Sequence, residues 1–211
     1  INVKPDEILI EPEPKNTAPA ILAGISLIQQ KKGNVFTLIL PSDHQVTATD
    51  DFQNTIVDAA NLMKTNQIMT FGAQPKYAAT GFGYIRSRED NTVIEFVEKP
   101  TETRAKKFMK EGNYFWNSGM FLTKCKTMLA AGHNFTNKTQ KLVESSLKNS
   151  IRDLDFLRLD PESWTCITPD SVDYAIMEKA KNISVTKLKF EWRDLGDWLA
   201  LADELAVPNN N

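Results

Sequence analysis

Apolar and polar residues form alternating blocks along the chain, and these blocks predict strands and helices in turn. Residues 35–40 are apolar apart from one threonine and rich in β-branched and aromatic side chains, which is typical of a strand buried on both faces of a parallel sheet. Residues 50–64 carry apolar side chains at helical spacing, with Phe52, Ile56 and Met63 on one face. The chain therefore opens with the alternation of an α/β protein.

The same patterns predict the remaining elements. Strands are expected at residues 7–10, 67–72, 80–85, 92–97, 114–122 and 183–190, and helices at 20–32, 102–111, 125–149, 151–159, 170–180 and after Trp198. Thr17 is expected to cap the first helix, because Pro19 would then lie in the first turn. This order predicts a layered sheet with helices on both faces.

Asp43 follows the predicted strand at residues 35–40 and so lies at its carboxyl end. Ligands of open α/β sheets bind at that edge, where a carboxylate can hold a metal ion or a hydroxyl group. The alternative is that Ser42 or Asp43 is the N-cap of a following helix. The pattern alone leaves both interpretations open.

Composition limits the class of protein. The 211 residues are 41% hydrophobic and 25% charged with a net charge of -2, which suits one large domain and provides no broad basic surface for nucleic acid or anionic membrane. Cys125 and Cys166 lack the spacing of metal ligands and read as free thiols. No signal peptide or apolar run of membrane length is visible. We therefore expect a cytoplasmic protein with no nucleic acid or membrane partner.

Polar side chains recur near the predicted strand ends, at Asp43, Glu98, Lys99, Asn117 and Asp194. Each alone could be a cap, a surface ion pair or a turn residue. Glycines beside them, including Gly83, would let a ligand approach the backbone. Carboxylates and amides among aromatic rings suit a sugar, and a neighbouring lysine suits a phosphate. The two aspartates suit one Mg²⁺ that also holds substrate phosphates.

Six motifs occur in order along the chain. They are residues 40–44 (LPSDH), 80–85 (TGFGYI), 96–100 (FVEKP), 116–121 (WNSGMF), 171–179 (SVDYAIMEK) and 192–198 (WRDLGDW), preceded by matching residues at 11–12 and 15–20. Together they resemble bacterial mannose-1-phosphate guanylyltransferases of type II, which are often fused to mannose-6-phosphate isomerase. Motifs in this order over residues 11–198 make the resemblance specific.

The resemblance implies a nucleotidyltransferase fold, a three-layer α/β/α sandwich that is glycosyltransferase-A-like, Rossmann-like and built on a mixed sheet. It implies that GTP and mannose 1-phosphate give GDP-mannose and pyrophosphate with Mg²⁺, supplying activated mannose for polysaccharide synthesis. In this family the metal is held by the acids that correspond here to Asp43 and Asp194. The attacking phosphate is already ionised, so His44 is interpreted as structural rather than as a base.

The resemblance also implies the other site residues. Gly83, Glu98, Lys99 and Asn117 would line the sugar-phosphate pocket, with Lys99 also counted as catalytic, and Asp173 would lie on the sugar side. Asn16 and Thr17 would approach the nucleotide base. The family usually has arginine where this chain has Lys15, and that change removes a planar bidentate contact.

The family opens with a glycine-rich loop that cradles the triphosphate, and the sequence contains no such loop. We therefore expect residues 1–205 to be a nucleotidyltransferase catalytic domain without its N-terminal segment, inactive alone, and residues 206–211 to begin a linker. The alternatives are a pyrophosphorylase for another sugar or base and a non-catalytic module that binds sugar nucleotides. The sequence leaves a homo-oligomer open.

Overall fold

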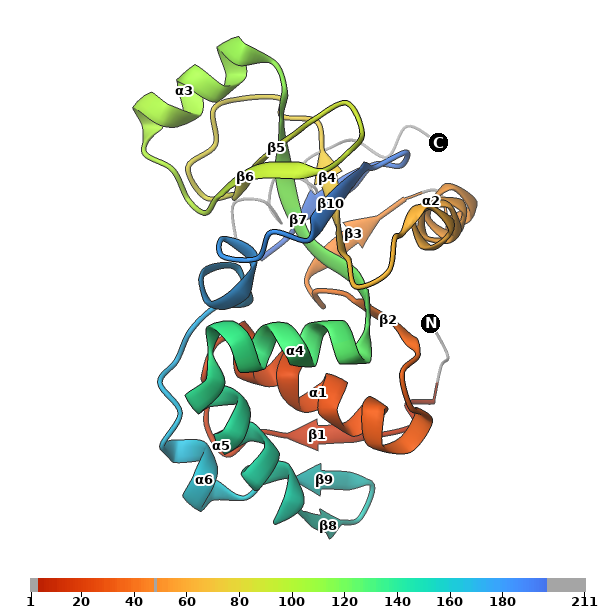
Figure 1. Ribbon diagram of the computed structural model, residues 1–211, viewed down its shortest axis with the longest axis vertical. Helices are drawn as coiled ribbons and strands as arrows, with labels where there is room; N and C mark the ends of the chain where they lie inside the picture. The colour runs from red at the N-terminus through yellow and green to blue at the C-terminus, as the bar shows by residue number, and fades with distance from the viewer. Residues whose placement is uncertain (1–3, 48, 197–211) are drawn as a thin grey trace, which may run out of the picture. The chain divides into compact units, whose positions relative to one another are not determined.

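A computed structural model of the chain describes residues 4–47 and 49–196 (Figure 1). The chain forms two compact units, one of residues Ile1–Thr37 with Thr123–Lys181 and one of residues Leu38–Leu122 with Asn182–Asn211. Among the described residues, no helix has the length and apolarity that crossing a membrane requires. The expected closing helix after Trp198 and the linker at 206–211 lie outside the described residues.

The first unit packs helices beside a three-stranded sheet. Its elements are β1 (Ile8–Ile10), α1 (Thr17–Lys32), α4 (Cys125–Phe135), α5 (Asn137–Lys148), β8 (Ile151–Asp153), β9 (Phe156–Arg158), α6 (Pro161–Thr165) and the π-helical turn η1 (Asp173–Met177). The strand order is β1-β9-β8, with β1 parallel and β8 antiparallel to β9. Helix α1 packs against α4 and α5, as Figure 1 shows.

The second unit is built on a mixed sheet. Its elements are β3 (His44–Val46), α2 (Thr49–Leu62), β4 (Ile68–Ala73), β5 (Tyr84–Ser87), β6 (Val93–Val97), α3 (Glu102–Glu111), β10 (Ile183–Lys187) and β11 (Trp192–Asp194). The strand order is β10-β4-β7-β5-β6, where β7 (Tyr114–Lys124) and its partner β2 (Phe36–Ile39) contain the boundaries between the units. Strand β10 is parallel to β4, whereas β5 is antiparallel to β6 and β7. The predicted α/β class with a mixed sheet is confirmed.

Capping residues explain where two of the helices begin and end. The Thr101 side chain accepts from the backbone N–H of Arg104 at the start of α3, and Gly112 ends that helix in a left-handed conformation with φ 71°. At α1 the capping residue is Asn16, whose side chain accepts from the N–H of Thr17 at 2.8 Å. The prediction that Thr17 is the cap is wrong, since Thr17 is already helical.

Strand 35–40 differs most from its prediction. Val35, Phe36 and Leu40 are 37%, 48% and 49% exposed, so the expected burial on both faces is wrong. Strand β2 pairs with β7, and none of residues 36–39 is fully buried. After Asp43 the chain enters strand β3 and not a helix, which excludes the N-cap interpretation of Ser42 and Asp43.

The chain between residues 125 and 180 also departs from the prediction. Thr136, with φ -143°, divides residues 125–149 into two helices, and the helix expected at 170–180 is only the short turn η1. The helix predicted at 151–159 is wrong, because these residues form the hairpin of β8 and β9. Leu154 stands at its tip with φ 54° and is 85% exposed. Strand pairing with β1 outweighs the helical preference of this leucine-rich segment.

Candidate functional site

Asp43 and Asp194 come together through the pairing of β3 with β11. Asp194 lies opposite His44 in this antiparallel pair, and the N–H of Leu195 donates to the carbonyl of Asp43 at 3.0 Å. A Cβ atom on Gly196 would lie 2.9 Å from Asp194 Oδ1 and 2.9 Å from Asp43 Oδ2. These two oxygens are therefore separated by no more than twice that distance, although about 150 residues divide them in sequence.

His44 stands between the two acids. Its Nε2 lies 3.9 Å from Asp43 Oδ1 and 3.9 Å from Asp194 Oδ2, and its Nδ1 accepts a hydrogen bond of 3.0 Å from Trp192 Nε1. Burial lowers the pKa of His44, and the charges of Asp194 and Asp43 oppose that effect. A neutral His44 that accepts at Nδ1 carries its proton on Nε2, the nitrogen that faces the acids.

The acid pair fits a hard divalent cation. Both donors are carboxylates, and the Asp43 and Asp194 side chains are 55% and 32% exposed, so an ion and its waters can reach them. Within residues 4–47 and 49–196, no group of three or more His, Cys, Asp or Glu side chains is arranged to hold a metal. Two protein ligands suit Mg²⁺, which keeps several positions for water and substrate phosphate.

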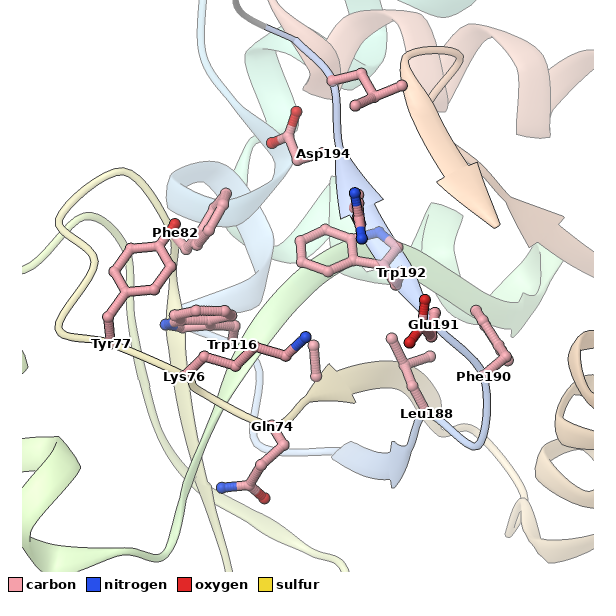
Figure 2. Close-up of a pocket in the computed structure, with 13 residues that line it drawn as sticks. Gln74, Lys76, Tyr77, Phe82, Trp116, Leu188, Phe190, Glu191, Trp192 and Asp194 are labelled. Carbon is pink, nitrogen blue, oxygen red and sulfur yellow. The ribbon is translucent and has the colours of Figure 1, made fainter. Parts of the chain in front are cut away.

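An aromatic pocket of about 410 Å³ adjoins Asp194 (Figure 2). Its rings include Tyr77, Phe82, Trp116 and Trp192, and the centroid of Trp116 lies 4.9 Å from that of Tyr77 and 5.1 Å from that of Phe82. The other lining residues are Ala73, Gln74, Lys76, Leu188, Phe190, Glu191, Arg193, Asp194 and Leu195. Ring faces beside polar groups match the two kinds of surface on a sugar.

Gly83, Glu98 and Asn117 form a packed cluster. A Cβ on Gly83 would lie 2.5 Å from Glu98 Oε2 and 3.3 Å from Asn117 Cβ. The expectation that Gly83 leaves room for a ligand needs correction, because the Glu98 carboxyl group occupies that space. Asn117 is 8% exposed, and its Oδ1 accepts from Thr70 Oγ1 at 3.0 Å and from the N–H of Gly119 at 3.3 Å.

Lys99 follows β6 in a left-handed conformation with φ 44° and is exposed. A residue with a Cβ is strained there, and such strain concentrates at functional sites. Of the predicted site residues, Asp194 lines the aromatic pocket; the described lining does not include Gly83, Glu98, Lys99 or Asn117.

The predicted residues Asn16, Thr17 and Asp173 belong to the first unit. Asn16 caps α1 with φ 67°, and Thr17 Oγ1 accepts from the N–H of Val172 at 2.9 Å. Asp173 begins the turn η1, and its carbonyl accepts from the N–H of Glu178. Lys15 is buried, with Nζ 3.0 Å from the carbonyl of Thr165 and 2.6 Å from Glu13. The ammonium at the position of the family's arginine is therefore held by neighbouring groups of this unit.

Lys76 and Tyr77 line the pocket but belong to none of the six motifs, so they were not predicted as site residues. The two precede the glycine-bearing turn and face the pocket, as Figure 2 shows. The available signal was a tyrosine and a lysine after Pro75, placed just before the aromatic motif at residues 80–85.

Comparisons with known proteins agree on one family. Residues 3–207 match the family described as "Nucleotidyl transferase". The chain is 36% identical over 207 residues to a mannose-1-phosphate guanylyltransferase of Sinorhizobium fredii, covering 95% of this chain and 40% of that protein. It is 36% identical to the xanthan biosynthesis protein XanB of Xanthomonas campestris, covering 96% of this chain and 44% of that protein. It thus spans less than half the length of these relatives.

Among solved structures, a Helicobacter pylori protein named mannose-6-phosphate isomerase superposes with a TM-score of 0.81 and 28% identity, over 89% of this chain and 74% of that one. The nucleotidyltransferase fold implied by the motifs is confirmed by the family match together with the likeness to solved structures. The chain belongs to the nucleotidyl transferase family.

Proposed function

We propose that the protein transfers the guanylyl group of GTP to mannose 1-phosphate, giving GDP-mannose and pyrophosphate, and so supplies activated mannose for polysaccharide synthesis. The observation that carries the proposal is the acid pair Asp43 and Asp194 beside an aromatic pocket that Asp194 itself lines. The names of the relatives from S. fredii and X. campestris support the substrate and the pathway. The protein would work in the cytoplasm.

The reaction needs charge neutralisation and alignment more than acid–base chemistry. An ionised oxygen of mannose 1-phosphate attacks the α-phosphorus of GTP, the bond from the α-phosphorus to the bridging oxygen breaks, and pyrophosphate leaves with that oxygen. Nucleotidyltransferases generally use a divalent metal ion. Mg²⁺ held by Asp43 and Asp194 would neutralise charge on the phosphates. His44, fixed by Trp192, keeps an N–H directed at the acids and so helps to orient them.

The remaining roles follow from the motifs and remain proposals. Glu98 and Asn117 bind sugar hydroxyls, and Lys99 binds phosphate. Gly83 makes room for the Glu98 carboxyl group, as the packed cluster supports. Asn16 and Thr17 approach the guanine base, and Asp173 contributes on the sugar side. An isomerase domain in the same protein, which the motif resemblance implies, is a further part of the proposal, and the relatives, more than twice as long as this chain, have room for one.

The test is pyrophosphate release by the full-length protein with Mg²⁺, using GTP, ATP, UTP and dTTP in every combination with mannose 1-phosphate, glucose 1-phosphate and galactose 1-phosphate. GTP with mannose 1-phosphate should give the highest kcat/KM by about tenfold or more. A higher value for another pair would identify a different pyrophosphorylase. Binding of GDP-mannose without pyrophosphate release from any pair would identify a non-catalytic module.

A sugar-site variant sharpens this assay. Asn117→Ala should raise the KM for mannose 1-phosphate by about tenfold and leave the KM for GTP nearly unchanged, since an unpaired polar group in the sugar site costs about 1 to 3 kcal/mol. Thr70→Val is the matched control, because it removes only the hydroxyl that donates to Asn117. Equal losses for both substrates in Asn117→Ala would mean that this side chain supports the fold.

A further inference from the structure

The aromatic pocket contains a lysine that no motif accounts for. Lys76 lies on the segment that leaves β4, directly after the buried Pro75. The carbonyl of Tyr77 accepts from the N–H of Ala79 at 3.0 Å and from the Tyr84 hydroxyl at 3.5 Å. Lys76 therefore lies between a buried proline and a hydrogen-bonded carbonyl, and these restrain the point from which its side chain extends.

The ammonium of Lys76 has no ion pair or hydrogen-bond partner among the described parts of the chain. Some other lysines of this unit are engaged: Lys189 pairs with Asp58 at 2.7 Å, and Lys187 lies over the ring of Phe115. Figure 2 shows the Lys76 side chain extending from the Gln74–Tyr77 side toward Trp192, across the pocket. The charge is thus presented to whatever the pocket binds.

The pocket also contains two acids, Glu191 and Asp194. A sugar 1-phosphate carries a dianionic group. The proposed Mg²⁺ would offset the charge of Asp194, but Glu191 would still repel the phosphate unless a cation lies close by. Arg193 also lines the pocket and already interacts with another group, so Lys76 is the cation left to meet the phosphate. Lysine is a compact point charge with rotatable donors, which suits a phosphate that must move during the reaction.

We propose, on the basis of the function proposed above, that Lys76 binds the phosphate group of the sugar 1-phosphate while the aromatic rings hold the sugar. Lys76 then determines affinity for the phosphorylated sugar and does not act on GTP. Lys99, which is not part of the described lining, serves a different phosphate contact.

The experiment compares Lys76→Met with Lys76→Arg in the full-length protein. Calorimetry gives the Kd for mannose 1-phosphate and for mannose, and steady-state kinetics give the KM for GTP. Lys76→Met should raise the Kd for mannose 1-phosphate by about tenfold, which is the scale of one charge-assisted hydrogen bond. The Kd for mannose and the KM for GTP should each change by less than about twofold. Lys76→Arg should recover most of the affinity for mannose 1-phosphate. The Kd for mannose 1-phosphate should depend less on salt concentration in Lys76→Met than in the wild type.

The control is Lys110→Met, which removes the same charge from an exposed position in the last turn of α3. Three results with Lys76→Met would each overturn the assignment. They are an unchanged Kd for mannose 1-phosphate, an equal rise in the Kd of mannose and of mannose 1-phosphate, and a change confined to the KM for GTP. If the wild-type protein instead takes another sugar 1-phosphate with the same dependence on Lys76, the proposed substrate is wrong and the assignment of Lys76 stands.

Discussion

Trp192 Nε1 donates a hydrogen bond of 3.0 Å to His44 Nδ1, and this bond fixes which nitrogen of His44 carries the proton. Since burial lowers the pKa of His44, the imidazole is neutral at pH 7.5 with its proton on Nε2. Trp192→Phe should populate the other tautomer, because about 1 kcal/mol of hydrogen bonding is lost. The ring ¹⁵N chemical shifts report the tautomer. His133 is the internal control, since the sequence has only two histidines, and an unchanged His44 spectrum would contradict the prediction.

Removing the charge of either Asp43 or Asp194 should lower activity without lowering stability. We expect Asp43→Asn and Asp194→Asn each to lower kcat by about 10² or more, and the double variant to lose little beyond the worse single one, because the pair acts as a unit. Without metal, each variant should be at least as stable as the wild type, since two adjacent carboxylates repel each other. Pyrophosphate release and urea unfolding measure the two properties. The control is Asp155→Asn on the exposed hairpin; additive losses of rate would argue against a shared ion.

Gly83→Ala and Gly81→Ala form a matched pair. The first adds a Cβ at 2.5 Å from Glu98 Oε2, whereas the second meets nothing within 4 Å. The Glu98 carboxyl group can swing aside, so Gly83→Ala should raise the KM for mannose 1-phosphate severalfold and lower the unfolding free energy by less than about 1 kcal/mol. Gly81→Ala should match the wild type in both measurements. If the KM is normal in Gly83→Ala, the position of Glu98 is unimportant for the sugar.

Lys99→Gly and Lys99→Ala both remove the ammonium but differ in backbone strain. With φ at 44°, glycine is relaxed and alanine is not, so Lys99→Gly should unfold with a free energy about 1 kcal/mol above that of Lys99→Ala. Activity should fall to the same extent in both variants if the charge is what matters. Recovery of activity in Lys99→Gly would instead assign the role to the backbone conformation.

The partly buried carboxyl group of Glu11, in the first unit, should make the unfolding free energy depend on pH. Burial raises the pKa of the Glu11 carboxyl, although a hydrogen bond from the backbone of Lys15 opposes this. The raised pKa means that protonation favours the folded state, so this contribution is complete below the unfolded pKa of 4.5 and is lost as pH rises through the folded value. Glu11→Gln should therefore equal the wild type near pH 4 and exceed its stability at pH 7. Urea unfolding at both values checks this, with Glu162→Gln as the control; a pH-independent difference would contradict it.

Local signals predicted some elements well. The bounds expected for α3 agree with the structure because Thr101 and Gly112 are strong start and stop signals. The hairpin of β8 and β9 was missed because a positive φ at Leu154 and pairing with β1 are not visible in a periodic pattern. The exposure of Phe36 was missed for a similar reason, since an apolar run does not reveal what covers it.

The candidate site was likewise predicted only in part. The nearness of Asp43 and Asp194 follows from motifs far apart in sequence, which spacing alone could not have joined. The glycine argument identified Gly83 but not its neighbour, because the Glu98 side chain that fills the space belongs to another strand end. Lys76 and Tyr77 lie outside the six motifs, and only the folded structure shows that they line the pocket.

Helix α4 crosses its neighbours at Gly132. A Cβ there would lie within van der Waals overlap of the Gln140 side chain of α5 and 2.9 Å from Leu22 of α1, and both neighbours are fully buried. Three helices thus meet where there is no room for a methyl group. An alanine at position 132 would therefore require the Gln140 and Leu22 side chains to shift or the three helices to move apart, so the residues that fit at positions 22, 132 and 140 depend on one another.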